Sequence, residues 1–137
     1  SQLIGASVAG YTLLFIFGNP AASVNNLAAG VTVGQGLLVE FILTFFLMFV
    51  IFGIAVDKRG STHHPGLAIG SVLIFDHIVG LGLTGASMNP ARTFGVALAS
   101  GSWANHLVYW IAPILGAIAA AYVYQAAFMK KQDIKKK

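Results

Sequence analysis

The tripeptide Asn89-Pro90-Ala91, followed directly by Arg92, interrupts an apolar stretch that carries no other Asp, Glu, Lys or Arg from position 77 to position 129. A guanidinium is costly in lipid, so Arg92 must face protein or a water-lined cavity, and an ionisable residue inside a membrane is by default a candidate functional site. Asn is a preferred helix N-cap, and Pro is preorganised for the first helical position. These four residues therefore predict a helix that begins at membrane depth.

The predicted helix is short. From Pro90 to about Ser100 it would rise roughly 16 Å at 1.5 Å per residue, about half of a ~30 Å hydrocarbon core. Its positive end would then lie near the bilayer centre, with unsatisfied N–H groups and the Asn89 amide beside it. Non-helical backbone at that depth is tolerated only where it is buried in protein or lines an aqueous cavity. We therefore expect a re-entrant half-helix at a pore.

Composition and charge agree with a membrane protein. Hydrophobic residues make up 57% of the chain and charged residues only 9%, with a mean hydropathy of +0.80, which indicates an integral, multi-pass membrane protein. Seven of the eight Lys and Arg residues fall at 58–59 and 130–137, a pattern that puts both segments on the cytoplasmic side and argues against a nucleic-acid partner. The absence of cysteine excludes disulfides.

Apolar segments are expected to be helical at 3–17, 37–56, 66–83 and 107–129. The first has only 15 residues, short of the ~20 that span a bilayer. Because the chain also starts without Met, we expect this segment to begin before Ser1. The neutral region 18–36 is expected outside the membrane, and the half-helix would enter from that side. Asn19-Pro20-Ala21 repeats the tripeptide, but its turn-forming surroundings predict a simple turn there.

Residues around the tripeptide also carry a family resemblance. The run from Thr84 to Gly95, TGASMNPARTFG, resembles the second signature loop of the aquaporin (major intrinsic protein) family. Gly34-Gln35-Gly36 with Glu40 resembles the start of that family's fourth span. Asn105-His106 to Trp110 resembles the start of its sixth span. The resemblance covers nearly the whole chain.

This resemblance implies an all-α membrane protein, the C-terminal repeat of a fold with six spans and two half-helices. The chain would be one partial channel domain that needs the N-terminal half of the same channel, and the family usually assembles as homotetramers. Its parts would be the end of span three (1–17), an outer loop (18–36), span four (37–56), a cytoplasmic loop (57–65), span five (66–83), the re-entrant loop and half-helix (84–100), span six (107–129) and a cytoplasmic tail (130–137).

The resemblance also implies site residues. His77, Ala86 and Arg92 match positions of the selectivity constriction, and the alternative for His77 is a structural histidine satisfied within the bundle. Asn89 would donate to passing water. Along the loop, hydrogen bonds from the passing water would be accepted by the backbone carbonyls of Gly85, Ala86, Ser87 and Met88. With Arg92 and the positive helix end opposing cations, the pore would exclude protons and ions.

Four further ionisable residues lie outside this set. Glu40 resembles the family's buttress carboxylate, which accepts hydrogen bonds from the re-entrant loop. Asp76 departs from the family pattern, and because adjacent helix positions point about 100° apart it should face away from the pore. His63 and His64 could form a titratable gate or simply be solvated, and a His-His pair alone does not predict a metal site.

The resulting prediction is a passive water channel in the plasma membrane, with water and the lipid bilayer as partners. His77 and Thr93 favour water, whereas glycerol-conducting relatives carry a small residue and an aspartate at those positions. Ala86 leaves room for other small neutral solutes, so an aquaglyceroporin-type facilitator is the first alternative. A structural or junctional membrane protein of the same fold is the second alternative. A secondary transporter with a broken helix at the membrane midplane is a further one. No catalytic constellation, cofactor or metal site is predicted.

Overall fold

The computed structural model describes residues 1–18, 24–60 and 64–129, and within these ranges the chain is entirely helical and irregular, without a strand. The helices are α1 (Gln2–Phe17), α2 (Val33–Ile51), η2 (Phe52–Val56), α3 (Pro65–Gly80), α4 (Pro90–Ser100), α5 (Val108–Tyr124) and η3 (Gln125–Met129). Of these, η2 and η3 are single-turn π-helices that follow α2 and α5. Asn19-Pro20-Ala21, His63 and the 130–137 tail lie outside the described residues.

Two helices are long and apolar enough to cross a membrane by length and composition, Val33–Val56 and Val108–Met129. Gln2–Phe17 and Pro65–Gly80 are shorter apolar helices. The helix of the expected 37–56 span begins earlier, at Val33, because Thr32 and Gln35 form a capping box. Gln35 N–H donates to Thr32 Oγ1 at 3.3 Å, and Thr32 N–H donates to Gln35 Oε1 at 2.8 Å, which satisfies two N–H groups at the helix start.

The helix of the expected 66–83 span ends earlier than predicted, at Gly80. The Gly80 carbonyl accepts hydrogen bonds from Leu83 N–H at 3.0 Å and Thr84 N–H at 2.9 Å. These bonds close a turn over residues 81–84, from which the chain enters the non-helical segment 84–89, here called the re-entrant loop. The apolar character of Leu81 and Leu83 continues past the helix end, so hydropathy alone placed the boundary too late.

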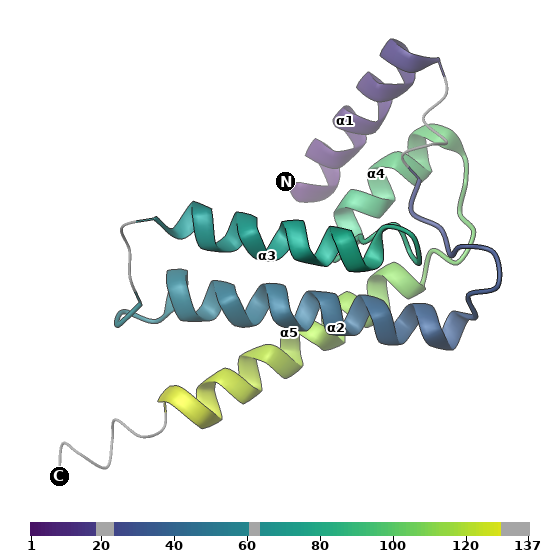
Figure 1. Ribbon diagram of the computed structural model, residues 1–137. Helices are drawn as coiled ribbons and strands as arrows, with labels where there is room; N and C mark the ends of the chain where they lie inside the picture. The colour runs from purple at the N-terminus through teal and green to yellow at the C-terminus, as the bar shows by residue number, and fades with distance from the viewer. Residues whose placement is uncertain (19–23, 61–63, 130–137) are drawn as a thin grey trace, which may run out of the picture.

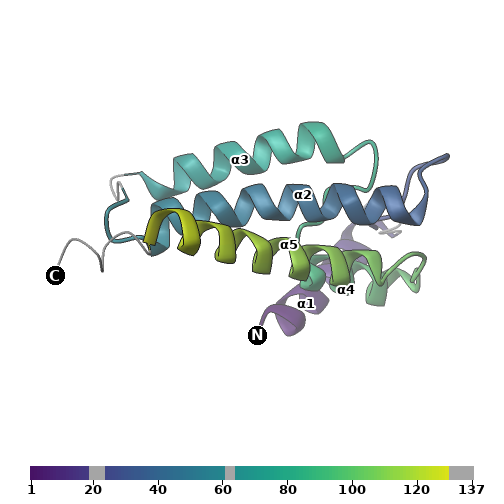
Figure 2. The ribbon, with the colours of Figure 1, turned by 90° about the horizontal axis from the view of Figure 1, so that it is seen from below.

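The helices form a bundle in which α2 lies between α3 and α5, as both views show (Figures 1 and 2). The α2–α5 contact is close at Gly116, where an added Cβ would lie 2.5 Å from the Phe41 carbonyl oxygen and 3.2 Å from Thr44 Cβ. Small residues at helix crossings allow such approach inside membranes, where apolar burial itself gives little drive for association.

The short helix α4 pairs with α1 at one end of the bundle, next to α5 (Figure 2). Two glycines make the pairing possible. A Cβ at Gly95 would overlap the backbone of Ala6, and a Cβ at Gly10 would overlap the Gly95 carbonyl. The α1 and α4 backbones are therefore in direct contact, which fixes the position of α4 against α1.

At the opposite end, Asp57 ties the loop after η2 to the end of α5. Its carboxylate accepts hydrogen bonds from Arg59 N–H at 2.9 Å and Tyr124 Oη at 2.9 Å, and it forms a salt bridge with the Arg59 guanidinium. Arg59 also donates to the Phe128 carbonyl at 2.9 Å. The bonds from Arg59 hold the pKa of Asp57 well below its usual range. This contribution to stability is therefore present above the ordinary carboxyl pKa and is lost as the pH falls through the lowered pKa.

Candidate functional site

The site begins at the N-terminus of α4, where Asn89 caps the helix. Asn89 has extended backbone (φ −150°), and its Oδ1 accepts hydrogen bonds from Ala91 N–H at 2.8 Å and Arg92 N–H at 3.3 Å. Pro90 occupies the first helical position, where it lacks an N–H that would otherwise be unsatisfied. No acceptor among the described residues takes a hydrogen bond from Asn89 Nδ2. The cap thus uses the oxygen of the amide and leaves its N–H donors available.

The re-entrant loop before Asn89 has an unusual backbone. Gly85, Ala86 and Met88 have positive φ values of 80°, 47° and 53°, a conformation that prevents both helix and strand pairing. Within the described part of the chain, the carbonyls of Ala86, Ser87 and Met88 accept no hydrogen bond. Backbone carbonyls away from bulk water are normally paired. Three successive buried carbonyls next to Asn89 therefore accept no hydrogen bond from the described residues.

Gly85 and Ala86 differ from the expectation that both line a pore. The Gly85 carbonyl accepts a hydrogen bond from Asn25 Nδ2 at 2.8 Å, so one of its acceptor positions is filled from within the protein. The Ala86 side chain has no exposed surface and belongs to a buried cluster with Leu43 and Met88. Its methyl group packs against Gly80, which has no side chain to fill that space. Only the Ala86 carbonyl, and not its methyl group, remains unengaged.

Glu40 of α2 holds the re-entrant loop. It is fully buried and accepts three hydrogen bonds, from Thr84 Oγ1 at 2.6 Å, Ser87 N–H at 2.9 Å and Met88 N–H at 2.8 Å. A buried carboxylate needs such donors to offset its lost hydration. From α5, the buried Tyr109 donates to the Thr84 carbonyl at 2.8 Å. Two long helices thus fix the loop through the residues that precede Asn89.

Asn25, in the segment before α2, fixes the other side of the site. Its side chain is 3% exposed, and Oδ1 accepts hydrogen bonds from Arg92 Nη1 at 2.6 Å and Thr93 Oγ1 at 3.1 Å. Thr93 Oγ1 is in turn bonded to Ser87 Oγ. Asn25 therefore positions the guanidinium relative to the loop. Sequence analysis missed it, because Asn25 stands in a polar segment whose composition resembles any surface loop.

His77 of α3 is half-buried, with Nδ1 2.8 Å from the Leu73 carbonyl oxygen. A carbonyl can only accept, so Nδ1 carries the proton and Nε2 is free to accept a further hydrogen bond. His77 lines a hollow on α3 with Leu73, Ile74, Ile78 and Leu81. Arg92 lines a different groove, so this chain does not bring these two predicted constriction residues together in one hollow.

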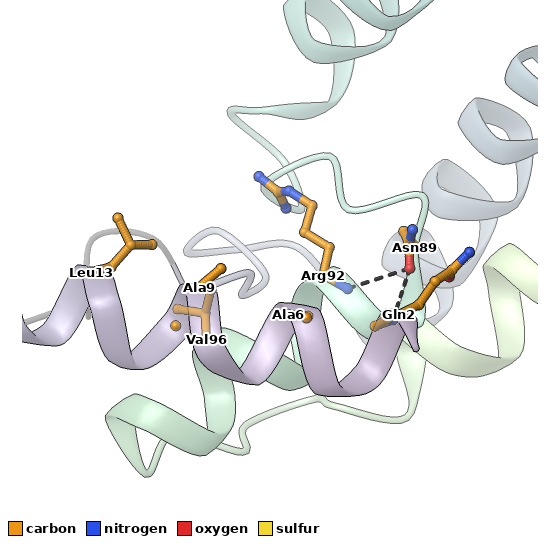
Figure 3. A pocket seen from close by; sticks show the side chains of 10 residues that line it. Gln2, Ala6, Ala9, Leu13, Asn89, Arg92 and Val96 are labelled. Atoms are coloured by element: carbon orange, nitrogen blue, oxygen red, sulfur yellow. Dashed lines mark hydrogen bonds between the residues drawn. The ribbon is translucent and has the colours of Figure 1, made fainter.

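That groove runs between α1 and α4 and has a volume of ≈ 630 Å³. Figure 3 shows Asn89 and Arg92 near one end of it, with the Arg92 side chain extended away from α1. The remaining wall is mostly apolar and includes Ala6, Ala9, Leu13 and Val96. Arg92 is exposed in the groove apart from its bond to Asn25. The groove therefore has the polar side chains of Asn89 and Arg92 near one end and a mostly apolar wall along α1 and α4.

Two other predicted positions line neither hollow. Asp76 is 5% exposed on α3, and its Oδ2 has no hydrogen-bond partner among the described residues. His64 is exposed and immediately precedes α3.

Comparisons with known proteins agree with this architecture. The family model described as Major intrinsic protein matches residues 1–124. Aquaporin TIP4-2 of Zea mays is 43% identical over 130 residues, which cover 94% of this chain and 51% of that protein. Aquaporin-4 of Mus musculus is 39% identical over 142 residues, which cover 100% of this chain and 44% of that protein.

A solved structure extends the comparison to the fold. The X-ray structure of the aquaglyceroporin from Plasmodium falciparum aligns with a TM-score of 0.81, over 96% of this chain and 63% of that chain, at 23% identity. The chain spans about half the length of the curated relatives it matches. The predicted resemblance is confirmed: the chain belongs to the major intrinsic protein family, that of the aquaporins, and is an all-α integral membrane protein.

Proposed function

We propose that this chain forms one side of the pore of a passive water channel that excludes protons and ions. The observation that carries the proposal is the row of unengaged carbonyls of Ala86, Ser87 and Met88 next to the free Nδ2 donors of Asn89. A water molecule both donates and accepts, so this stripe can replace part of its hydration. The groove wall is mostly apolar and offers few further partners, so binding is weak and passage fast.

Exclusion of cations follows from charge. The N-terminal end of α4 carries the positive end of the helix dipole, and the Arg92 guanidinium lies within its first turn. Both oppose a cation, including hydronium. Conduction requires the other side of the pore, which we assign to the N-terminal half of the same channel. Homotetramer assembly and the plasma membrane remain predictions, tested by native mass spectrometry and by microscopy of the tagged full-length protein.

A facilitator of small neutral solutes is the second candidate. It is favoured by one observation, that His77 and Arg92 line separate hollows, so the described residues do not by themselves close a narrow constriction. The P. falciparum aquaglyceroporin shares the fold alone and does not decide between the two candidates.

The deciding experiment is stopped-flow light scattering of proteoliposomes that contain the full-length channel. We expect water permeability severalfold above that of protein-free liposomes, little glycerol uptake, and no proton leak reported by an internal pH-sensitive dye. Rapid glycerol uptake would establish the solute facilitator instead. Permeability to neither would support the structural or junctional protein of the same fold.

His77→Ala tests the proposed constriction. Removing the imidazole enlarges the hollow and takes away the Nε2 acceptor, so we expect glycerol permeability to rise severalfold while water permeability persists. His64→Ala is the matched control, because His64 is exposed and lies outside the site. Equal glycerol permeability in both variants and in the wild type would remove His77 from the constriction.

Asn25→Ala tests the positioning of Arg92. The substitution removes the acceptor for Arg92 Nη1 and Thr93 Oγ1, so the guanidinium becomes mobile and the ratio of glycerol to water permeability should rise severalfold. The neighbouring Asn26 is exposed and bonds only to Leu27 and Asn105 among the described residues. Asn26→Ala should therefore leave this ratio unchanged, and a similar rise in that variant would contradict the assignment.

A further inference from the structure

Asp76 occupies the face of α3 that packs against α2. Leu73, Asp76 and Gly80 are spaced so that they share this face. Leu73 packs against the buried cluster of Leu43, Ala86 and Met88, and Gly80 packs against Leu43 and Ala86. The Asp76 carboxyl, between them in the sequence and 5% exposed, is therefore held between the two helices, beside the re-entrant loop.

Asp76 differs from the other buried carboxylates in the described ranges. Glu40 accepts three hydrogen bonds, and Asp57 is bonded to Arg59 and Tyr124. By contrast, Asp76 Oδ2 is buried without any hydrogen-bond partner in the described part of the chain. A buried ionised oxygen without a donor is strongly disfavoured.

The charge on Glu40 adds to this penalty, whereas His77 acts in the opposite direction. Glu40, from α2, and His77, from the same helix, are the titratable groups that act on it electrostatically. The other segments against this face, η2 and residues 81–89, contain no titratable side chain. A charge on Asp76 would be repelled by the Glu40 carboxylate, and the described residues give Asp76 Oδ2 no hydrogen-bond donor to offset this repulsion.

We propose that Asp76 is a proton-operated switch, a neutral carboxylic acid whose ionisation loosens the re-entrant loop held by Glu40. When the proton leaves, the new charge repels the Glu40 carboxylate, which carries the bonds to Ser87 and Met88. Alkaline pH therefore weakens the hydrogen bonds that hold the re-entrant loop, and with it the row of carbonyls and Asn89. The expected consequence is a falling thermal unfolding temperature and a falling water permeability as the pH rises.

Infrared spectroscopy of the full-length protein in lipid tests the protonation directly. The wild type should show the C=O stretching band of a protonated carboxylic acid, which weakens as the pH rises. Asp76→Asn should lack the band, whereas Asp57→Asn should keep it, because Asp57 is held ionised by Arg59. A band that persists in Asp76→Asn, or no such band in the wild type, would overturn the proposal.

The switch is tested by thermal unfolding and by stopped-flow water permeability across the same pH range. The permeability readout rests on the proposed function, but the unfolding and infrared readouts do not. We expect the unfolding temperature of the wild type to fall as the pH rises, and its water permeability to fall severalfold. In Asp76→Asn both should stay at the values that the wild type has at acidic pH. An unfolding temperature that does not respond to pH in the wild type, or responds equally in Asp76→Asn, would refute the switch. If the wild type conducted no water at any pH, the proposed function would fail while infrared and unfolding still decided the role of Asp76.

Discussion

Replacing Glu40 by leucine is expected to abolish water permeability and to lower the free energy of unfolding more than any other substitution considered for the site. The carboxylate accepts from the Ser87 and Met88 N–H groups and from Thr84 Oγ1. Leucine has a similar volume but leaves these buried donors without an acceptor. Each unsatisfied buried donor costs about 1–3 kcal/mol, so the total loss should reach roughly 4 kcal/mol or more.

The measurement is thermal unfolding of the full-length protein together with stopped-flow permeability in proteoliposomes. Leu38→Ala, at an exposed position of α2 two residues away, controls for generic disturbance of the helix and should change neither property. Glu40→Gln should lie between the wild type and Glu40→Leu, because one acceptor oxygen remains. A Glu40→Leu protein that conducts water normally would show that the buttress is dispensable.

The second large effect is expected for Gly95→Ala. The added Cβ would overlap the Ala6 backbone, and backbone, unlike a side chain, cannot move to another rotamer. We therefore expect a cost near the upper end of the range for overpacked cores, about 3 kcal/mol. Because α4 carries Asn89 and Arg92, its displacement from α1 should also lower water permeability strongly.

Gly5→Ala on α1 is the matched control. A Cβ at Gly5 would meet nothing within 4 Å, and alanine is the better helix former, so this variant should be at least as stable as the wild type. Circular dichroism melting and proteoliposome permeability of the full-length variants would separate the two outcomes. Equal behaviour of Gly5→Ala and Gly95→Ala would show that the α1–α4 contact does not position the half-helix.

The bounds of α4 were predictable because its end signals are local. Asn89 and Pro90 start the helix within two residues, and Gly101 ends it with a left-handed backbone of φ 72°. The start of α2 had a similar local signal, the Thr32–Gln35 capping box, which the hydropathy pattern does not reveal. The end of α3 at Gly80 had no hydropathy signal, because apolar residues continue beyond it.

The partners of the site residues were only partly predictable. The resemblance implied that Glu40 bonds to the re-entrant loop, and the contacts to Ser87 and Met88 are present. The hydrogen bond from Arg92 Nη1 to Asn25 Oδ1 joins residues 67 positions apart. Such a contact depends on how the segment before α2 folds over the bundle, which no spacing in the sequence encodes.

The sequence by itself determined that this is a helical membrane protein of the aquaporin family with a half-helix at Pro90, because apolar length, helix capping and the signature loop are local properties of the chain. Only the tertiary structure decided which carbonyls of the described residues accept no hydrogen bond, that the Ala86 methyl is buried, and that Asp76 Oδ2 has no partner among those residues. Those outcomes depend on which atoms of distant segments meet, and side-chain burial and hydrogen bonding are settled only when the helices pack.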